Sequence, residues 1–128
     1  MTAMPEITPL AAENAGIFAR FERDGVNLDE QTSVEFICEF PQVEDARACR
    51  KALRSHFHES GLPAGVSDLL YVVCDYSKTA EPSETRLTAN MVPTVERVTI
   101  IERAFNDVAA RQNGGTVCWE FEEPRKVS

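Results

Sequence analysis

Hydrophobic residues in the last third of the chain follow first a helical and then a strand period. One set recurs at spacings of three and four residues and so lies on one face of a helix: Val95, Val98, Ile101, Phe105 and Val108. Thr94 is a candidate N-cap, and Asn113, Gly114 and Gly115 favour the end of a helix. A second set alternates with the residues between them, as in a half-buried strand: Val117, Trp119 and Phe121 against Cys118, Glu120 and Glu122. This stretch therefore predicts a capped helix followed by a final strand.

The polar positions of this helix predict which side meets solvent. Arg97, Arg103, Asp107 and Arg111 fall opposite the apolar stripe. Glu96 and Glu102 are expected to place negative charge near the positive end of the helix dipole.

The same periodicities predict five earlier elements. The strand at 32–40 alternates strictly, with Val34, Phe36, Cys38 and Phe40 toward the core. The helix at 43–60 has an apolar stripe of Ala46, Cys49, Leu53 and Phe57, and Gly61 and Pro63 end it. In chain order, we predict a helix from Pro9 or Leu10 to Asp24, a strand Thr32–Phe40, a helix from about Val43 to Ser60, and hairpin-related strands Ser67–Tyr76 and Thr85–Val92.

The order of elements, helix then β-α-β-β-α-β, is typical of a ferredoxin-like fold. We therefore expect an α+β fold, a ferredoxin-like βαββαβ sandwich with an additional N-terminal helix. The other face of the sheet would be open or covered by that helix. At 128 residues the chain suits one domain. We expect a flexible N-terminus at 1–8, the domain at 9–123 and a tail at 124–128.

The net charge of −8, from 13 basic and 21 acidic residues, disfavours direct binding to nucleic acid and favours basic protein surfaces. The sheet face opposite the predicted core would carry Glu35, Glu39, Glu120 and Glu122, and it lacks stacking aromatic residues, so RNA recognition of the RRM kind is disfavoured. The ordinary interpretation of these carboxylates is a solvated acidic face. The functional interpretation is that they bind a basic site on a partner protein.

No catalytic, metal or cofactor constellation is evident. The four cysteines, Cys38, Cys49, Cys74 and Cys118, are widely spaced and lie among apolar neighbours, so we expect reduced, packed thiols in a cytoplasmic protein. His56 and His58 point about 200° apart around a helix and cannot share one metal. We expect no signal peptide, and no apolar run approaches the roughly 20 residues needed to span a bilayer.

The chain resembles the ribonuclease E inhibitor family, also called regulator of ribonuclease activity B. The resemblance rests on an acid-glycine turn in ERDGVNL, the strand VEFICEFP with the helix start VEDARA, and the run MVPTVERVTIIE followed by AARQNGG and a tryptophan strand. It extends from about Asn14 to Glu123. The family typically shows Tyr-Asp-Gly-Trp after the paired glycines, whereas this chain has TVCW.

The resemblance implies a ferredoxin-like, acidic, cytoplasmic bacterial protein that binds ribonuclease E and restrains RNA cleavage, with no catalytic residues. We therefore expect a non-enzymatic regulator that binds a protein partner, an endoribonuclease. Two other function classes are open at this point, a small-molecule-sensing module and a small enzyme with a site between the sheet and the N-terminal helix. An exposed edge strand would also allow two copies to pair as a homodimer.

Overall fold

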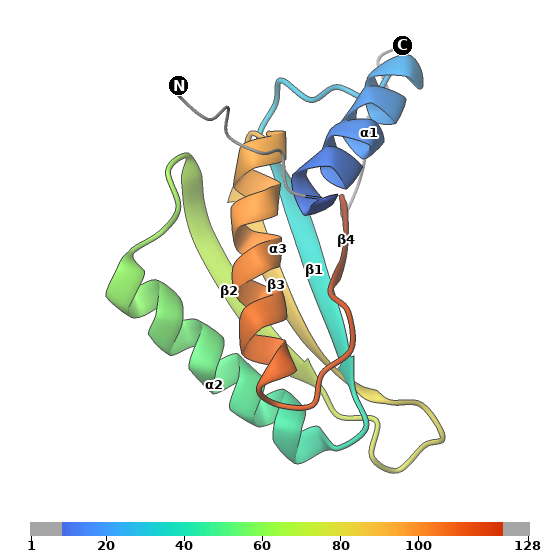
Figure 1. The fold of residues 1–128 in the computed structure, drawn as a ribbon, viewed down its shortest axis with the longest axis vertical. Coiled ribbons are helices and arrows are strands. Elements are labelled where there is room, and N and C mark those ends of the chain that lie inside the picture. Colours follow the sequence, from blue (N-terminus) through green and yellow to red (C-terminus); the bar gives the residue numbers. More distant parts are fainter. Residues whose placement is uncertain (1–8, 122–128) are drawn as a thin grey trace, which may run out of the picture.

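The structure, a computed structural model, describes residues 9–121 and contains three helices around a four-stranded sheet (Figure 1). The elements are α1 (Pro9–Arg23), β1 (Thr32–Phe40), α2 (Val43–Ser60), β2 (Val66–Cys74), β3 (Ser83–Met91), α3 (Val95–Ala110) and β4 (Cys118–Phe121). The predicted elements are all present, and the boundaries of β1 and α2 agree residue for residue. No described helix is long and apolar enough to cross a membrane.

The sheet is antiparallel with strand order β2-β3-β1-β4. Phe36 in β1 lies opposite Leu87 on β3 and opposite Trp119 on β4, which fixes the register of the central strands. Because a one-residue slip would turn every side chain of a strand to the other face, this register settles which residues meet the core. The β-α-β-β-α-β order and this strand order confirm the predicted ferredoxin-like α+β fold.

All three helices cover the same face of the sheet (Figure 1). Helix α1 lies beside α3, and the ring of its Phe18 is 5.8 Å from that of Trp119. Trp119 faces the same side as its register partner Phe36, which is completely buried under the helices. The sequence left two possibilities, that the other face of the sheet is open or that the N-terminal helix covers it. The structure places α1 in the helical layer with α2 and α3. No described helix covers the opposite face of the sheet.

The core lies between the sheet and the helical layer. Strand β1 contributes its alternate residues, and the predicted inward set of Val34, Phe36, Cys38 and Phe40 is fully buried. The predicted stripe of α2 is buried as well. Thr94 caps α3 as expected, since its side chain accepts a hydrogen bond from the backbone N–H of Arg97 at 3.1 Å. Apolar periodicity thus assigned the core side of these elements correctly.

Two polar residues of α3 depart from their predicted roles. Arg97 does not extend into solvent, because its guanidinium donates to the carbonyls of Val92 at 2.6 Å and Ala64 at 3.2 Å. It therefore ties the start of β2 to the end of β3. Glu102 is not a surface charge near the helix start: it lies two turns into the helix and is 4% exposed, facing α1.

The segments expected to be flexible at 1–8 and to form a tail at 124–128 lie outside the described residues, and so does Glu122. The division into a domain at 9–123 with two end segments therefore stays a prediction.

Candidate partner-binding surface

The uncovered side of the sheet is the most distinctive surface of the described chain, and we call it the open face. Its side chains form rows across the strands because directly paired residues share a face. One row is Leu70, Thr88, Glu35 and Glu120, and the next is Val72, Arg86, Ile37 and Cys118. The flanking rows are Asp68, Asn90 and Ser33 on one side and Cys74, Glu84 and Glu39 on the other.

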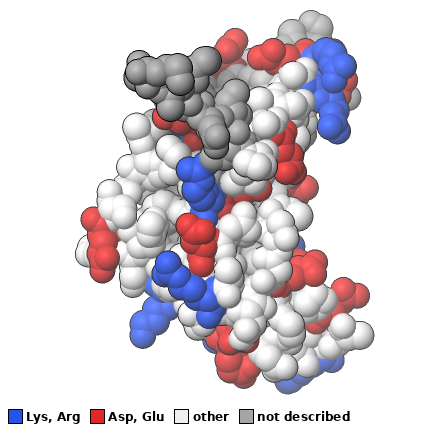
Figure 2. All heavy atoms as spheres, viewed as in Figure 1, with Lys and Arg blue, Asp and Glu red and all other residues white. Residues whose placement is uncertain are grey.

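Charge on the strands is concentrated on this face and is predominantly negative. The four strands hold five carboxylates and one basic residue, Arg86. The register places all of them on the open face: Glu35, Glu39, Asp68, Glu84, Glu120 and Arg86. By contrast, the helix-bearing side mixes acidic and basic side chains (Figure 2). The fold therefore separates an acidic sheet surface from a helical surface of mixed charge.

Glu35 is held by its own chain. The Arg86 guanidinium lies 3.2 Å from Glu35 and 2.9 Å from Glu84, and it bridges β1 and β3. The hydrogen bond that Arg86 donates to Glu84, followed by the charges of Glu84 and Glu35, raises the pKa of Arg86. The Glu35 side chain is only 17% exposed. A partner that contacts Glu35 must therefore share it with Arg86.

The other three predicted contact residues differ in their surroundings. Glu39 and Glu120 are both exposed. Glu120 is the direct register partner of Glu35, and Glu39 lies opposite Glu84, so carboxylates face one another across both strand pairs. Glu122 lies outside the described residues. The structure thus brings Glu35 and Glu120 together and places Glu39 four residues further along β1.

The open face has an apolar and aromatic margin that was not predicted from the sequence. Leu70 and Val72 of β2 are 60% and 41% exposed. Tyr76 follows β2, and its hydrogen bond to Cys74, followed by the charges of Cys74 and Glu84, raises the pKa of its phenol, whereas the Arg86 charge lowers it. Among the described residues, the open face therefore has one aromatic residue at its corner. The strands themselves place no aromatic side chain on this face, as predicted. The signal in the sequence was the run LLYVV, in which both alternating sets are apolar.

Behind the acidic face, a buried polar cluster joins α1, α3 and β4. The Asn14 amide donates to Glu102 at 2.9 Å and to Thr99 at 3.0 Å, while Trp119 donates its indole N–H to Asn14 at 2.9 Å. Burial raises the pKa of Glu102. This cluster anchors α1, and it was not predicted because its members are far apart in the sequence.

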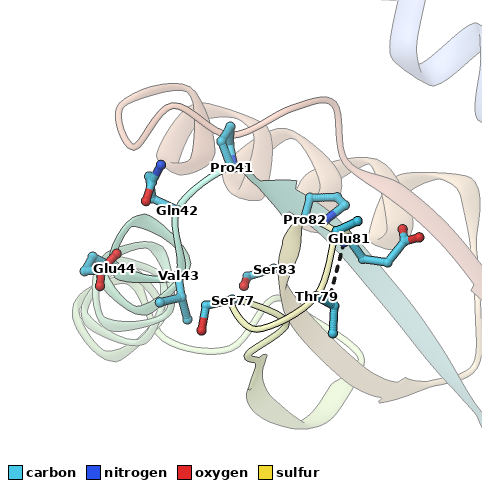
Figure 3. A pocket seen from close by; sticks show the side chains of 10 residues that line it. Pro41, Gln42, Val43, Glu44, Ser77, Thr79, Glu81, Pro82 and Ser83 are labelled. Carbon is cyan, nitrogen blue, oxygen red and sulfur yellow. Dashed lines mark hydrogen bonds between the residues drawn. The ribbon is translucent and has the colours of Figure 1, made fainter.

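A cavity of about 560 Å³ lies between the start of α2 and the β2–β3 loop (Figure 3). Its hydroxyl groups are engaged in local turns: Thr79 donates to the Tyr76 carbonyl at 2.7 Å and accepts from the Glu81 N–H at 3.1 Å, and Ser83 accepts from the Tyr76 N–H at 3.0 Å. The cavity is therefore built mainly by the backbone turns of two loops. It does not lie between the sheet and α1, where the enzyme alternative would have placed a site.

Cysteines and histidines are dispersed through the described residues, among which no group of three or more His, Cys, Asp or Glu side chains could hold a metal. All four thiols are free. Cys38 and Cys49 are buried as expected, and burial raises their pKa values to about 11 and about 12. Cys118 is exposed, so the prediction of a packed thiol was wrong there: its position in β4 points to the open face.

A family model described as "Regulator of ribonuclease activity B" matches residues 11–120. The chain belongs to this family. The match runs from α1 to β4, so it includes the open face and the Asn14–Trp119 cluster. The family resemblance inferred from sequence is therefore confirmed, and the family is one of regulators of ribonuclease activity.

Two solved structures show distant similarity to this member of the family. A dinuclear metal binding peptidase of the M20 family from Bacillus subtilis is 10% identical, with a TM-score of 0.37 over 77% of this chain and 27% of that chain. AtUAH in complex with glyoxylate is 14% identical, with a TM-score of 0.38 over 75% of this chain and 27% of that chain. The chain spans about a quarter of the length of both structures. Among curated proteins, no match was found.

Proposed function

We propose that this protein is a non-enzymatic cytoplasmic regulator that binds an endoribonuclease of the ribonuclease E kind through its acidic open face and restrains RNA cleavage. The family match supports regulation of a ribonuclease. The observation that carries the surface assignment is the segregation of five strand carboxylates onto one uncovered sheet face. An enzyme that handles RNA must expose basic surface to phosphates.

The mechanism follows from electrostatic complementarity. Carboxylates on the open face steer the protein toward a basic surface and raise the rate of association, an effect that salt screens. The docked acidic sheet would cover the basic surface of the enzyme that the RNA backbone must contact. Inhibition would then require no catalytic step in the regulator. Exposed Glu39 and Glu120 are the most available charges. Glu35 contributes through the Arg86 bridge, and Glu122 is a further candidate next to β4.

The first experiment is a pull-down of the tagged protein from its native cell extract at low and moderate salt, with the bound proteins identified. We expect an endoribonuclease or its degradosome companions to be recovered at low salt and lost as salt rises. The purified pair should then form a complex that slows cleavage of a model RNA. Recovery of the tagged protein alone, together with unchanged RNA cleavage by the purified enzyme, would contradict the proposal.

Charge reversal locates the surface. Glu39→Lys with Glu120→Lys should weaken binding about tenfold, equivalent to about 1.4 kcal/mol, and should flatten its salt dependence. The matched control is a double reversal of equal charge away from the sheet, at Glu59 near the end of α2 and Glu22 near the end of α1, both exposed. If the control weakens binding equally, net charge rather than the open face determines the affinity.

A further inference from the structure

Strand β2 lies at the edge of the sheet, yet its sequence is that of an interior strand. It pairs only with β3, so one side of its nine-residue backbone has no strand partner among the described residues. Its central run is Leu69, Leu70, Tyr71, Val72 and Val73. Strands that are buried on both faces have such continuous apolar runs, whereas natural edge strands are short or carry charges and proline that discourage pairing.

Both faces of this run have apolar area that the single chain leaves uncovered. Toward the open face, Leu70 and Val72 are 60% and 41% exposed. Toward the helices, Leu69, Tyr71 and Val73 are only half-buried, although their equivalents on β3, Leu87 and Ala89, are completely buried. The opposite edge is different, since the described part of β4 carries the exposed charge of Glu120. The exposed apolar surface is therefore specific to the β2 edge.

We propose that two copies of this chain associate through β2, in antiparallel pairing about a twofold axis beside Tyr71, to form one continuous eight-stranded sheet. A twofold interface must be self-complementary. With Tyr71 on the axis, Leu70 of one copy lies opposite Val72 of the other on the open face. Leu69 likewise lies opposite Val73 on the helical face. The apolar run is thus nearly symmetric in side-chain character about its centre, which a twofold axis requires.

The charges around β2 fit this arrangement. No charged residue occurs from Leu69 to Cys74, so the centre of the seam brings no like charges together. The acids that bound the run are engaged within their own chain: Asp68 accepts from Asn90 at 2.6 Å, and Asp75 lies 3.1 Å from Arg47. In the proposed register Asp68 lies opposite Cys74, and Asp75 lies opposite Ser67. A second copy therefore meets neither an unpaired buried charge nor a facing carboxylate.

One basic residue marks the site on the helical side. The Arg54 guanidinium of α2 sits 5.6 Å from the centre of the Tyr71 ring. Two copies of Arg54 would approach the axis together, which limits the affinity and makes the dimer more stable as salt increases. An acidic extended segment from another protein would instead pair more weakly as salt increases, so the sign of the salt dependence separates the two occupants.

Dimerisation would bring the two acidic open faces side by side on one sheet. Such a surface would allow the regulator to contact two basic sites at once and to gain from the second, intramolecular contact. The β2 interface itself does not depend on the proposed ribonuclease partner, because it is defined by the free protein alone.

Sedimentation equilibrium of the purified full chain over a wide concentration range tests the proposal. We expect a species of twice the 14.3 kDa chain mass that dissociates on dilution. Leu70→Lys with Val72→Lys should yield monomer at every concentration, and both positions are exposed enough for the variant to fold. The matched controls are Ile100→Lys with Leu62→Lys, on α3 and in the loop before β2, where the native residues are 43% and 48% exposed. These should still dimerise.

The register has its own test. In a background of Cys74→Ser and Cys118→Ser, Tyr71→Cys should form a cross-linked dimer under mild oxidation, whereas Ile100→Cys should not. A native protein that is monomeric at all concentrations would overturn the proposal, as would a dimer that survives the two lysines on β2. A monomer that binds an extended ribonuclease peptide in a manner sensitive to the same two lysines would assign the edge to a different occupant and would also overturn it.

Discussion

Trp119 and Asn14, 105 positions apart in the chain, share a hydrogen bond of 2.9 Å from the indole N–H to the amide oxygen. The same amide group donates to Thr99 and Glu102 on α3. Asn14 is 1% exposed, and no buried side-chain nitrogen or oxygen of the described residues lacks a partner. One amide on α1 therefore links this helix to α3 and to the edge strand β4.

Asn14→Ala should weaken the junction between α1, α3 and β4. The change leaves the Trp119 N–H and Glu102 without their amide partner, and each unsatisfied buried group costs about 1–3 kcal/mol. We expect a loss of about 2 kcal/mol or more in chemical denaturation. Because Trp119 is the only tryptophan, its fluorescence should also shift to longer wavelength as α1 loosens.

Glu13→Ala, an exposed neighbour on the same helix, is the control and should change neither the stability nor the emission by a comparable amount. Full stability of Asn14→Ala would show that α1 is held by its aromatic contacts alone.

Glu102→Gln should remove a pH dependence from folding. Burial raises the pKa of Glu102 above the ordinary value of 4.5, so the folded state holds this proton more tightly than the unfolded state. Its contribution to stability is therefore fully present below pH 4.5 and is lost as the pH rises through the raised pKa. The glutamine keeps an oxygen for the Asn14 amide but cannot ionise.

The measurement is the free energy of unfolding of both proteins across this pH range. The difference in favour of Glu102→Gln should grow as the pH rises, and the other carboxylates cancel because both proteins share them. A difference that is constant with pH would show that Glu102 titrates normally.

The sequence predicted what depends on periodicity and missed what depends on tertiary proximity. The stripe of Ala46, Cys49, Leu53 and Phe57 assigned the buried face of α2 because a helix repeats every 3.6 residues. Glu102 was misplaced because a carboxylate on an amphipathic helix normally faces water. Only the position of α1 shows that the Asn14 amide donates a hydrogen bond to it. Arg97 was misplaced for a similar reason, since its carbonyl partners belong to a loop and a strand end.

The candidate surface was predicted in the same uneven way. Strict alternation in β1 placed Glu35 and Glu39 on the side away from the core. Alternation does not show that Arg86 lies between two carboxylates, because that contact requires the register of β1 against β3. The apolar edge of β2 was visible as a run of β-forming residues, but its exposure depends on the strand order.

Gly114→Ala should destabilise the protein through a direct clash. A methyl group at this position would come 2.7 Å from the Phe40 ring and 2.9 Å from the Ala109 side chain, and both neighbours are completely buried. Overpacking of this kind typically costs about 1–3 kcal/mol. Thermal denaturation should show a lower midpoint for the variant.

The control is Gly16→Ala, within α1, where an added methyl meets nothing within 4 Å. Removing a glycine from a helix interior should stabilise by about 0.5–1 kcal/mol. Opposite signs are thus expected for the same chemical change. Equal effects would mean that the absence of a side chain at Gly114 is not required for close packing beneath Phe40.

Reaction with a thiol reagent at neutral pH should divide the four cysteines by burial. Cys118 is exposed on the open face and should react first, followed by half-buried Cys74. Burial raises the pKa of Cys38 from 9.0 to about 11, which lowers the thiolate fraction about a hundredfold below pH 9, and the thiolate is the reactive form. The pKa of Cys49, at about 12, is higher still. These two thiols should therefore react only when the protein unfolds, and added denaturant should make both reactive together.

The control is Cys118→Ser, which should remove the fast phase alone. The Gly115 carbonyl accepts the hydrogen bond of the Cys38 thiol at 3.3 Å. Rapid modification of Cys38 in the folded protein would mean that β1 opens locally beside Gly115.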